Sequence, residues 1–233
     1  YAQARELSHF ANGFLIGSAL MSHDDLDAAV KRVLLGENKV CGLTRAQDAR
    51  VAHEAGAIYG GLIFVASSPR AVDVAQARTV MAGAPLQYVG VFRNAPVETV
   101  SANVEQLGLV AVQLHGSEDQ NYIDTLRKQL PDSVQIWKAL SVGDTLPARD
   151  LNHVDKYLFD NGQGGSGKRF DWSLLSGQTL DNVLLAGGLG ADNCVEAAKT
   201  GCAGLDFNSG VESEPGKKDA EKVASVFRTL RAY

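Results

Sequence analysis

From residue 39 to the end of the chain, one unit recurs: a short apolar run, a polar loop and an amphipathic stretch. The apolar runs are rich in β-branched residues and show little alternation, which is typical of strands buried on both faces of a parallel sheet. Regular alternation of strand and helix also implies parallel strands joined by right-handed crossovers. We therefore predict eight strands, at residues 39–43, 59–65, 86–92, 110–114, 134–140, 156–159, 182–186 and 204–207.

Eight units favour a closed (β/α)8 TIM barrel over an open, doubly wound α/β sheet. The 233 residues agree, because such barrels commonly use roughly 200 to 250 residues as one domain. We place the barrel at residues 37–233 and a separate unit at residues 1–36. In that unit we expect an N-terminal βα extension, with an apolar strand at 12–21 and a helix carrying Leu26, Val30 and Leu34 on one face. It is either a cover for the bottom of the barrel or the end of another domain.

Composition excludes several classes of function. The net charge of −5 argues against a nucleic-acid or anionic-membrane partner, which calls for a basic surface. The three cysteines lack C-x-x-C spacing, so we expect neither a disulfide framework nor a metal site. No apolar run is long enough to span a membrane, and the first residues do not have the order of a signal peptide. We expect a soluble, cytoplasmic protein.

In a barrel of this kind the active site lies at the carboxyl ends of the strands. Four reactive side chains fall there: Cys41, Arg70, His115 and Asp160. An arginine fork can bind a carboxylate, although many loop arginines are only solvated. A carboxylate at the end of an apolar strand has its pKa raised by desolvation, or it caps the next loop. Cysteine and histidine at such positions are either catalytic groups or buried core residues, and position alone leaves this open.

Glycines follow the last three predicted strands. They occur in the segments Gly164-Gly165-Ser166-Gly167, Gly187-Gly188 and Ser209-Gly210. Without side chains, backbone N–H groups can approach a phosphate closely, and barrel phosphate sites often use the loops after strands seven and eight. We predict a phosphate site in this quadrant of the barrel mouth.

These residues give the chain a recognisable pattern: it resembles the phosphoribosylanthranilate isomerase family of tryptophan biosynthesis. The resemblance covers roughly residues 38–233. It is carried by KVCGLT at 39–44, SPR at 68–70, VGVF at 89–92, AVQLHG at 111–116, Asp160, GGSG at 164–167, FDW at 170–172, AGGL at 186–189 and SGVE at 209–212. It implies an intramolecular aldose–ketose isomerase that performs an Amadori rearrangement of N-(5′-phosphoribosyl)anthranilate without a cofactor.

The resemblance also implies a role for each site residue. Cys41 would be the general base and Asp160 the general acid. Arg70 would bind the anthranilate carboxylate, and Asp206 would lie on the anthranilate side or support it from behind. Since both catalytic groups have the wrong ionisation at neutral pH, we expect the site to raise the pKa of Asp160 and to lower that of Cys41. Phosphate binding would fall to backbone groups of Gly165, Ser166, Gly167, Gly187, Gly188, Ser209 and Gly210.

Residues 5–36 are similar to the last helix, strand and helix of indole-3-glycerol-phosphate synthase, an enzyme fused ahead of this isomerase in some bacteria. This similarity implies that residues 1–36 are a remnant of an upstream synthase barrel. We expect no synthase activity from this chain, and we expect a monomer because a fusion already tethers its two domains.

Two other classes of function fit parts of the pattern. Related barrels perform epimerisation, aldol chemistry or the analogous isomerisation of the histidine pathway. The last of these would be expected to have an aspartate where Cys41 stands, so Cys41 and Arg70 favour the anthranilate substrate. A non-catalytic binding module would keep phosphate affinity without turnover, and intact Cys41 and Asp160 argue against it.

Overall fold

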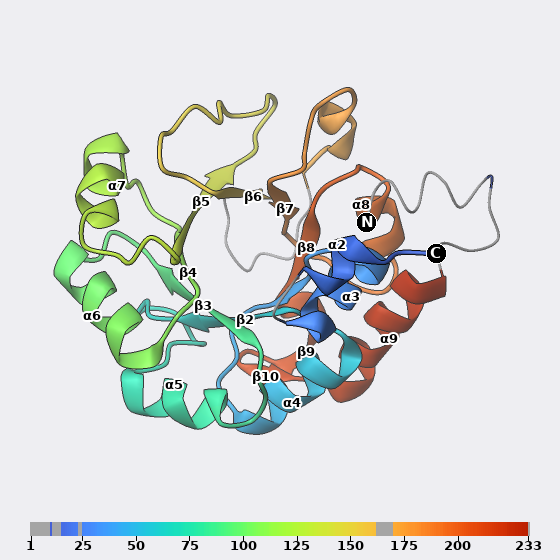
Figure 1. Ribbon diagram of the computed structural model, residues 1–233, viewed down its shortest axis with the longest axis horizontal. Helices are drawn as coiled ribbons and strands as arrows, with labels where there is room; N and C mark the ends of the chain where they lie inside the picture. Colours follow the sequence, from blue (N-terminus) through green and yellow to red (C-terminus); the bar gives the residue numbers. More distant parts are fainter. Residues whose placement is uncertain (1–9, 11–14, 23–24, 162–169, 233) are drawn as a thin grey trace.

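The computed structural model describes residues 10, 15–22, 25–161 and 170–232. Eight parallel strands close into a barrel in chain order, with helices around it (Figure 1). All eight predicted strands are confirmed, with ends that differ by a few residues. The strands are β1 Lys39–Val40, β2 Tyr59–Ile63, β3 Gln87–Phe92, β4 Ala111–Leu114, β5 Gln135–Ser141, β6 Lys156–Asp160, β7 Val183–Leu185 and β8 Gly204–Phe207.

The outer layer is uneven around the barrel. Its helices are α4 Ala46–Ala55, α5 Val74–Met81, α6 Val97–Leu107, α7 Gln120–Arg127, α8 Cys194–Ala198 and α9 Ala220–Ala232, with short 3-10 turns η1 Trp172–Leu175 and η2 Ser209–Val211. Between β5 and β6, the described segment 142–155 contains no helix. Gly143 and Pro147 disfavour a helix there, and Leu146 and Leu151 cover the sheet instead. A small hairpin, β9 Glu212–Glu214 and β10 Lys217–Lys218, follows β8; the sequence did not predict it.

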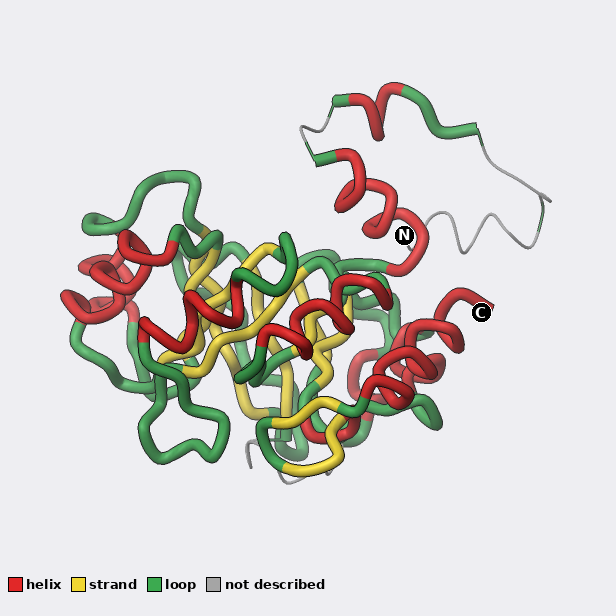
Figure 2. The backbone as a smooth tube through the Cα atoms, turned by 90° about the horizontal axis from the view of Figure 1, so that it is seen from below, coloured by secondary structure: helices red, strands yellow, loops and turns green. Residues whose placement is uncertain are grey.

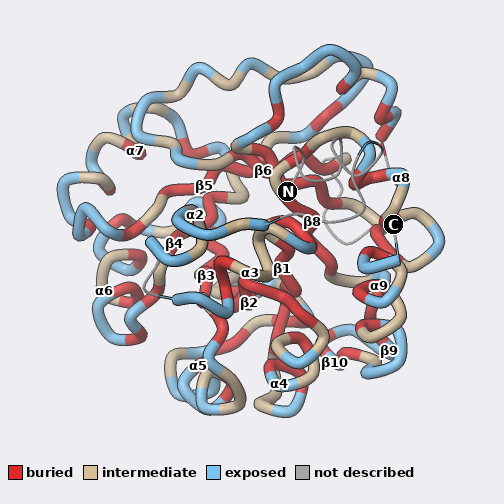
Figure 3. Tube along the Cα trace, turned by 45° about the vertical axis from the view of Figure 1, so that its right-hand side comes forward, coloured by how far each residue is buried: buried red, intermediate tan, exposed pale blue. Residues whose placement is uncertain are grey.

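The barrel strands are largely buried along their length (Figure 3). Their apolar residues form core clusters with residues of the surrounding helices. Near the amino ends of the strands, Trp137 is fully buried and packs edge-to-face against Tyr59, with ring centroids 4.9 Å apart. The lower barrel is therefore a packed core, and open space is left only toward the carboxyl ends.

The N-terminal segment agrees with the prediction only in its helix. Helix α3 (Leu26–Leu35) begins at Asp25, whose side chain accepts a hydrogen bond from the Ala28 backbone N–H at 3.0 Å. Ala28 packs with the residues of the lower barrel core, so α3 covers the bottom of the barrel. Arg32 fixes it there by hydrogen bonds to Glu37 and Gln87, both 3.2 Å long.

The predicted strand at 12–21 is wrong over its described part. Residues 18–21 form the short helix α2 (Ser18–Met21), which stands away from the barrel (Figure 2). A closed barrel offers no free sheet edge for a ninth strand to pair with, so this apolar run takes a local helical structure. Leu15 and Met21 are consequently exposed. Residues 12–14 lie outside the described part. Over the described ranges, every helix is too short or too polar to cross a membrane.

Candidate active site

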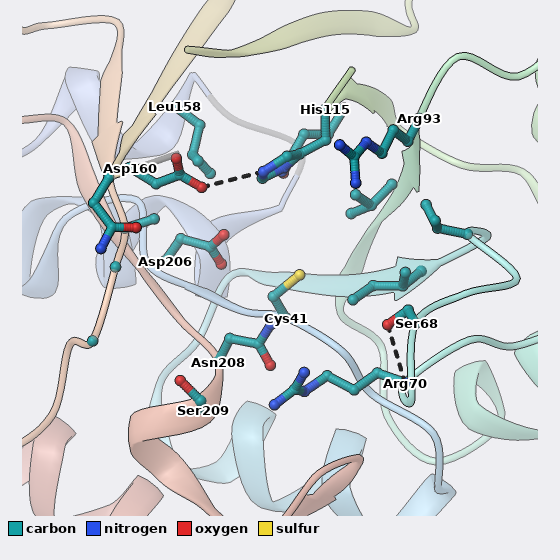
Figure 4. A pocket seen from close by; sticks show the side chains of 18 residues that line it. Cys41, Ser68, Arg70, Arg93, His115, Leu158, Asp160, Asp206, Asn208 and Ser209 are labelled. Carbon is teal, nitrogen blue, oxygen red and sulfur yellow. Dashed lines mark hydrogen bonds and ion pairs between the residues drawn. The ribbon is translucent and has the colours of Figure 1, made fainter. Parts of the chain in front are cut away.

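A cavity of about 190 Å³ opens at the carboxyl ends of the strands (Figure 4). Its described walls come from every strand of the barrel, or the loop after it, except β5. The structure brings most of the predicted site residues to this one cavity, namely Cys41, Arg70, His115, Asp160, Gly187, Gly188, Asp206 and Ser209. Gly210 is not among the residues that line the cavity, and Gly165, Ser166 and Gly167 lie outside the described residues.

Cys41 directly follows β1, and its sulfur points into the cavity (Figure 4). Its backbone N–H donates to the Phe207 carbonyl at 2.8 Å, which holds it against β8. The chain then turns through Gly42, whose φ of +69° favours glycine. A Cβ at this position would meet Cδ of Arg70 at 2.6 Å, so Gly42 also makes room for the arginine.

A buried ion pair, which the sequence did not reveal, lies beside the thiol. Nζ of Lys39 lies 3.0 and 2.9 Å from the two carboxylate oxygens of Asp206. The two residues are register partners on β1 and β8, and the Lys39 side chain is completely buried. Burial raises the pKa of Asp206, and the ammonium opposes this. Because both oxygens contact the ammonium, we assign the pair as ionised.

The thiol of Cys41 is subject to opposing influences. Burial raises its pKa most strongly; the ammonium groups of Lys39 and Lys218 lower it, and the Asp206 carboxylate raises it. The net pKa lies above that of an ordinary cysteine. The direction predicted from the sequence was therefore wrong, since desolvation outweighs the nearby cations.

Asp160 lies on another wall of the cavity, at the end of β6. Its Oδ2 is 3.2 Å from Nε2 of His115, which places His115 in the site, a question that position alone left open. Nδ1 of His115 is 3.2 Å from the side-chain nitrogen of Gln113. With that amide donating to Nδ1, the imidazole proton lies on Nε2 and points to Asp160. Oε1 of Gln113 is buried and has no hydrogen-bond partner among the described residues.

Arg70 is held by a carboxylate that sequence reasoning missed. Nε and Nη2 of Arg70 donate to Glu212 at 2.9 and 2.6 Å, and Lys218 donates to the same carboxylate at 2.7 Å. Burial would raise the pKa of Glu212, but the hydrogen bonds and charges of Arg70 and Lys218 outweigh it and lower the pKa. Arg70 lines the cavity, and its Nη1 has no partner among the described residues, so it is the donor left for a ligand.

The glycine loops after β7 and β8 pack closely together. Gly187 and Gly188 have φ values of +94° and +63°, where glycine is strongly favoured. A Cβ on Gly210 would lie 2.1 Å from the Leu189 carbonyl oxygen, so only glycine fits between the loops. Gly187, Gly188 and Ser209 line the cavity, so this wall carries no bulky side chain that would keep an anion from the backbone.

A closed barrel whose mouth holds a carboxylic acid, a thiol and an arginine fork defines an enzyme of acid–base chemistry. Comparison with known proteins identifies its family. Residues 38–229 match the family model of N-(5′phosphoribosyl)anthranilate (PRA) isomerase. The chain belongs to this family, and the family resemblance predicted from the sequence is confirmed.

The relatives agree with this assignment. The chain is 76% identical to the tryptophan biosynthesis protein TrpCF of Salmonella typhi and 54% identical to that of Vibrio cholerae, over its full length in both cases. It covers 52% and 50% of those proteins, so it spans about half their length. Among solved structures, phosphoribosyl anthranilate isomerase from Thermus thermophilus is 32% identical, with a TM-score of 0.75 over 84% of this chain and 98% of that one.

A further solved structure bears on the ligand. It is a phosphoribosyl anthranilate isomerase in complex with reduced 1-(o-carboxyphenylamino)-1-deoxyribulose 5-phosphate, 27% identical to this chain. The TM-score is 0.71 over 85% of this chain and all of the other. That protein therefore binds a phosphorylated ligand that carries a carboxyphenyl group.

Proposed function

We propose that this chain converts N-(5′-phosphoribosyl)anthranilate to 1-(2-carboxyphenylamino)-1-deoxyribulose 5-phosphate, the isomerisation that names its family. The observation that carries the proposal is the meeting of Cys41, Asp160, Arg70 and the glycine loops around one cavity. The substrate has a carboxylate at one end and a phosphate at the other. Arg70 and the glycine loops supply a site for each, and the thiol and the acid supply the chemistry between them.

Asp160 acts first, as the general acid. Its proton passes to the ribose ring oxygen, the C1–O bond breaks, and the nitrogen lone pair forms an iminium at C1. Cys41, as thiolate, then removes the C2 proton, and the electrons of that C–H bond form the C1–C2 double bond of an enolamine. Tautomerisation moves the C2 hydroxyl proton to solvent or base and delivers a proton to C1, which gives the ketose. Substrate nitrogen is the electron sink, so the proposal includes no cofactor.

The substrate is bound through its two charged groups, the carboxylate and the phosphate. Nη1 of Arg70 donates to the anthranilate carboxylate, while Glu212 holds the rest of the fork in place. Backbone N–H groups near Gly187, Gly188, Ser209 and Gly210 bind the phosphate, together with Gly165, Ser166 and Gly167. Asp206 lines the cavity with both oxygens engaged by Lys39, which favours a supporting role over direct substrate contact.

The wider setting is also part of the proposal. The tryptophan-biosynthesis relatives are about twice the length of this chain. We infer that it corresponds to the isomerase part of a bifunctional polypeptide, with residues 1–36 belonging to the end of the synthase part. We further infer that it is a cytoplasmic monomer, since tethering to the other activity needs no second copy.

The decisive experiment follows anthranilate fluorescence after freshly made phosphoribosylanthranilate is added to the protein. Enzyme-dependent decay is expected in the wild type, reduced by about 10² to 10⁴ in Cys41→Ser, as for the loss of a general base. Cys202→Ser is the matched control, because Cys202 is buried away from the cavity. Absence of decay from the folded wild type would refute the function, and full activity of Cys41→Ser would refute the assigned base.

A further inference from the structure

Among the described residues of the barrel, three lysines are buried, and each is paired with a carboxylate. Lys138 holds Glu118 and the Gly116 carbonyl, so it fixes the loop after β4. Lys218 holds Glu212, the partner of Arg70. Lys39 pairs with Asp206. Unlike the other two lysines, it holds neither a loop nor the partner of Arg70. A buried ion pair is weak evidence for stability, because its desolvation cost is large. The position of the Lys39–Asp206 pair beside the thiol of Cys41 points to another role.

The backbone places Lys39 and Cys41 on one face of the chain. They are two residues apart on and directly after β1, so both side chains point into the barrel. Across from them on β2 stands Gly61. A Cβ at Gly61 would lie 2.7 Å from the Cys41 sulfur and 3.0 Å from Cε of Lys39. The thiol and the lysine side chain therefore share the space that this glycine leaves open.

The charges around the sulfur are few and fixed. Those that act on it are Lys39 and Asp206 beneath it, Lys218 on the hairpin and Arg70 on the loop after β2. Lys218 and Arg70 share the single carboxylate of Glu212, so this cluster keeps a net charge of about +1. Lys39 is the cation with the largest effect on the thiol, and its influence opposes burial.

We propose that Lys39, held in place and kept charged by Asp206, stabilises the thiolate of Cys41. Lys39 is thus a positioning residue for the general base, and the inference rests on the proposed function only in naming Cys41 as that base. When the thiol loses its proton, the new negative charge forms next to an ammonium that already has a carboxylate partner. That carboxylate keeps the proton of Lys39 from passing to the sulfur, so the thiolate remains free to accept the substrate proton.

The test measures how readily Cys41 forms a thiolate, by a reaction that does not depend on turnover of the substrate. Iodoacetamide reacts with Cys41 when the thiolate displaces iodide, and mass spectrometry of the Cys41 peptide separates it from the buried Cys194 and Cys202. Two variants of the ion pair should act in opposite directions. Asp206→Asn removes the negative charge but keeps the ammonium, so alkylation at neutral pH should be faster and its pH midpoint lower. Lys39→Met/Asp206→Asn removes both charges and leaves none unpaired; alkylation should be about tenfold slower, with a midpoint about one pH unit higher.

The matched control is Lys138→Met/Glu118→Gln, which removes a similarly buried ion pair outside the cavity lining. This control should leave the alkylation midpoint of Cys41 unchanged. A general loosening of the barrel would instead shift the midpoint in both double variants by a similar amount. Equal midpoints in wild type, Asp206→Asn and the Lys39→Met/Asp206→Asn variant would overturn the proposal. Asp206→Asn alone decides the matter if the double variant fails to fold. Failure of the proposed base would appear as full turnover by Cys41→Ser, whereas failure of the charge effect would appear as unchanged alkylation midpoints. The two failures are therefore distinguishable.

Discussion

The two walls of the cavity that carry Cys41 and Asp160 are built differently. On the β1–β8 wall, the thiol of Cys41 lies beside a lysine and an aspartate that are both buried and bonded to each other. On the β4–β6 wall, Asp160 meets His115, whose side chain is 32% exposed. On the first wall the groups beside the thiol are all buried, whereas the second wall includes a partly exposed imidazole.

This difference matches the two proton transfers in the proposed reaction. A general acid that has given up its proton must regain one, and the partly exposed His115 contacts Asp160. A thiolate that removes a proton from carbon benefits from exclusion of water, which would stabilise it and reduce its basicity. The acid wall is arranged for exchange with solvent and the thiol wall for isolation.

The largest expected effect tests whether both walls are needed. Asp160→Asn keeps the shape and hydrogen-bonding ability of the side chain but removes the acidic proton. We expect kcat to fall by about 10² to 10⁴, comparable to the loss in Cys41→Ser. The measurement is the fluorescence assay under saturating substrate. Near wild-type turnover would mean that the acid wall takes no part in the chemistry.

A substitution at Gly61 should disturb the thiol wall alone. The Cβ of Gly61→Ala would lie 2.9 Å from Cα of Cys41 as well as 2.7 Å from its sulfur, so the thiol has to move. Misplacement of a reacting group by about 1 Å can lower the rate about 10²-fold. We expect a loss of that size in kcat, with a smaller change in KM. Gly143→Ala is the control, because nothing lies within 4 Å of a Cβ there.

The contribution of His115 should be smaller, because Asp160 itself remains. His115→Asn removes the imidazole next to Asp160, and the loss of one hydrogen bond to the acid should lower the rate by about tenfold. Imidazole added to the buffer should restore part of the loss if the ring exchanges protons with solvent. His153→Asn on the surface serves as the control. A loss that imidazole leaves unchanged would assign His115 a purely structural role.

The smallest expected effect is a loss of folding stability at acid pH. Carboxylates on both sides of the cavity should contribute to it. Hydrogen bonds and charges from Lys138 and Arg70 outweigh burial and lower the pKa values of Glu118 and Glu212, respectively. Each carboxylate therefore contributes stability above its ordinary pKa of about 4.3, and the contribution is lost as the pH falls through the lower folded value. Urea unfolding at pH 6 and below pH 4 should show this loss. Glu118→Gln should weaken the pH dependence.

The parts of this structure that could be predicted from the sequence depend on local patterns. Apolar runs at a fixed spacing predict eight strands, and the rule that barrel sites lie at strand ends selects Cys41 and Asp160. The apolar run at 12–21 shows the limit of the same reasoning. It has the composition of a strand, but strand formation needs a partner edge, and the closed barrel has none to offer.

Long-range pairs were not predictable in the same way. Lys39 and Asp206 meet because β8 closes against β1, and Arg70 meets Glu212 through a hairpin that the pattern did not indicate. Each member of these pairs is an ordinary charged residue in its own segment. Only the three-dimensional fold shows that Lys39 lies beside the thiol, or that the guanidinium of Arg70 already has a carboxylate partner.

The position of α3 has a consequence for dividing the chain into modules. By sequence this helix belongs with the preceding segment, but Ala28 fits into the bottom of the barrel, and Arg32 and Lys156 meet on Glu37. A shortened version designed to begin at Lys39 would leave the underside of the barrel open to water. A cut that keeps these contacts for a swap, a linker or a circular permutation lies before Asp25, the cap of that helix.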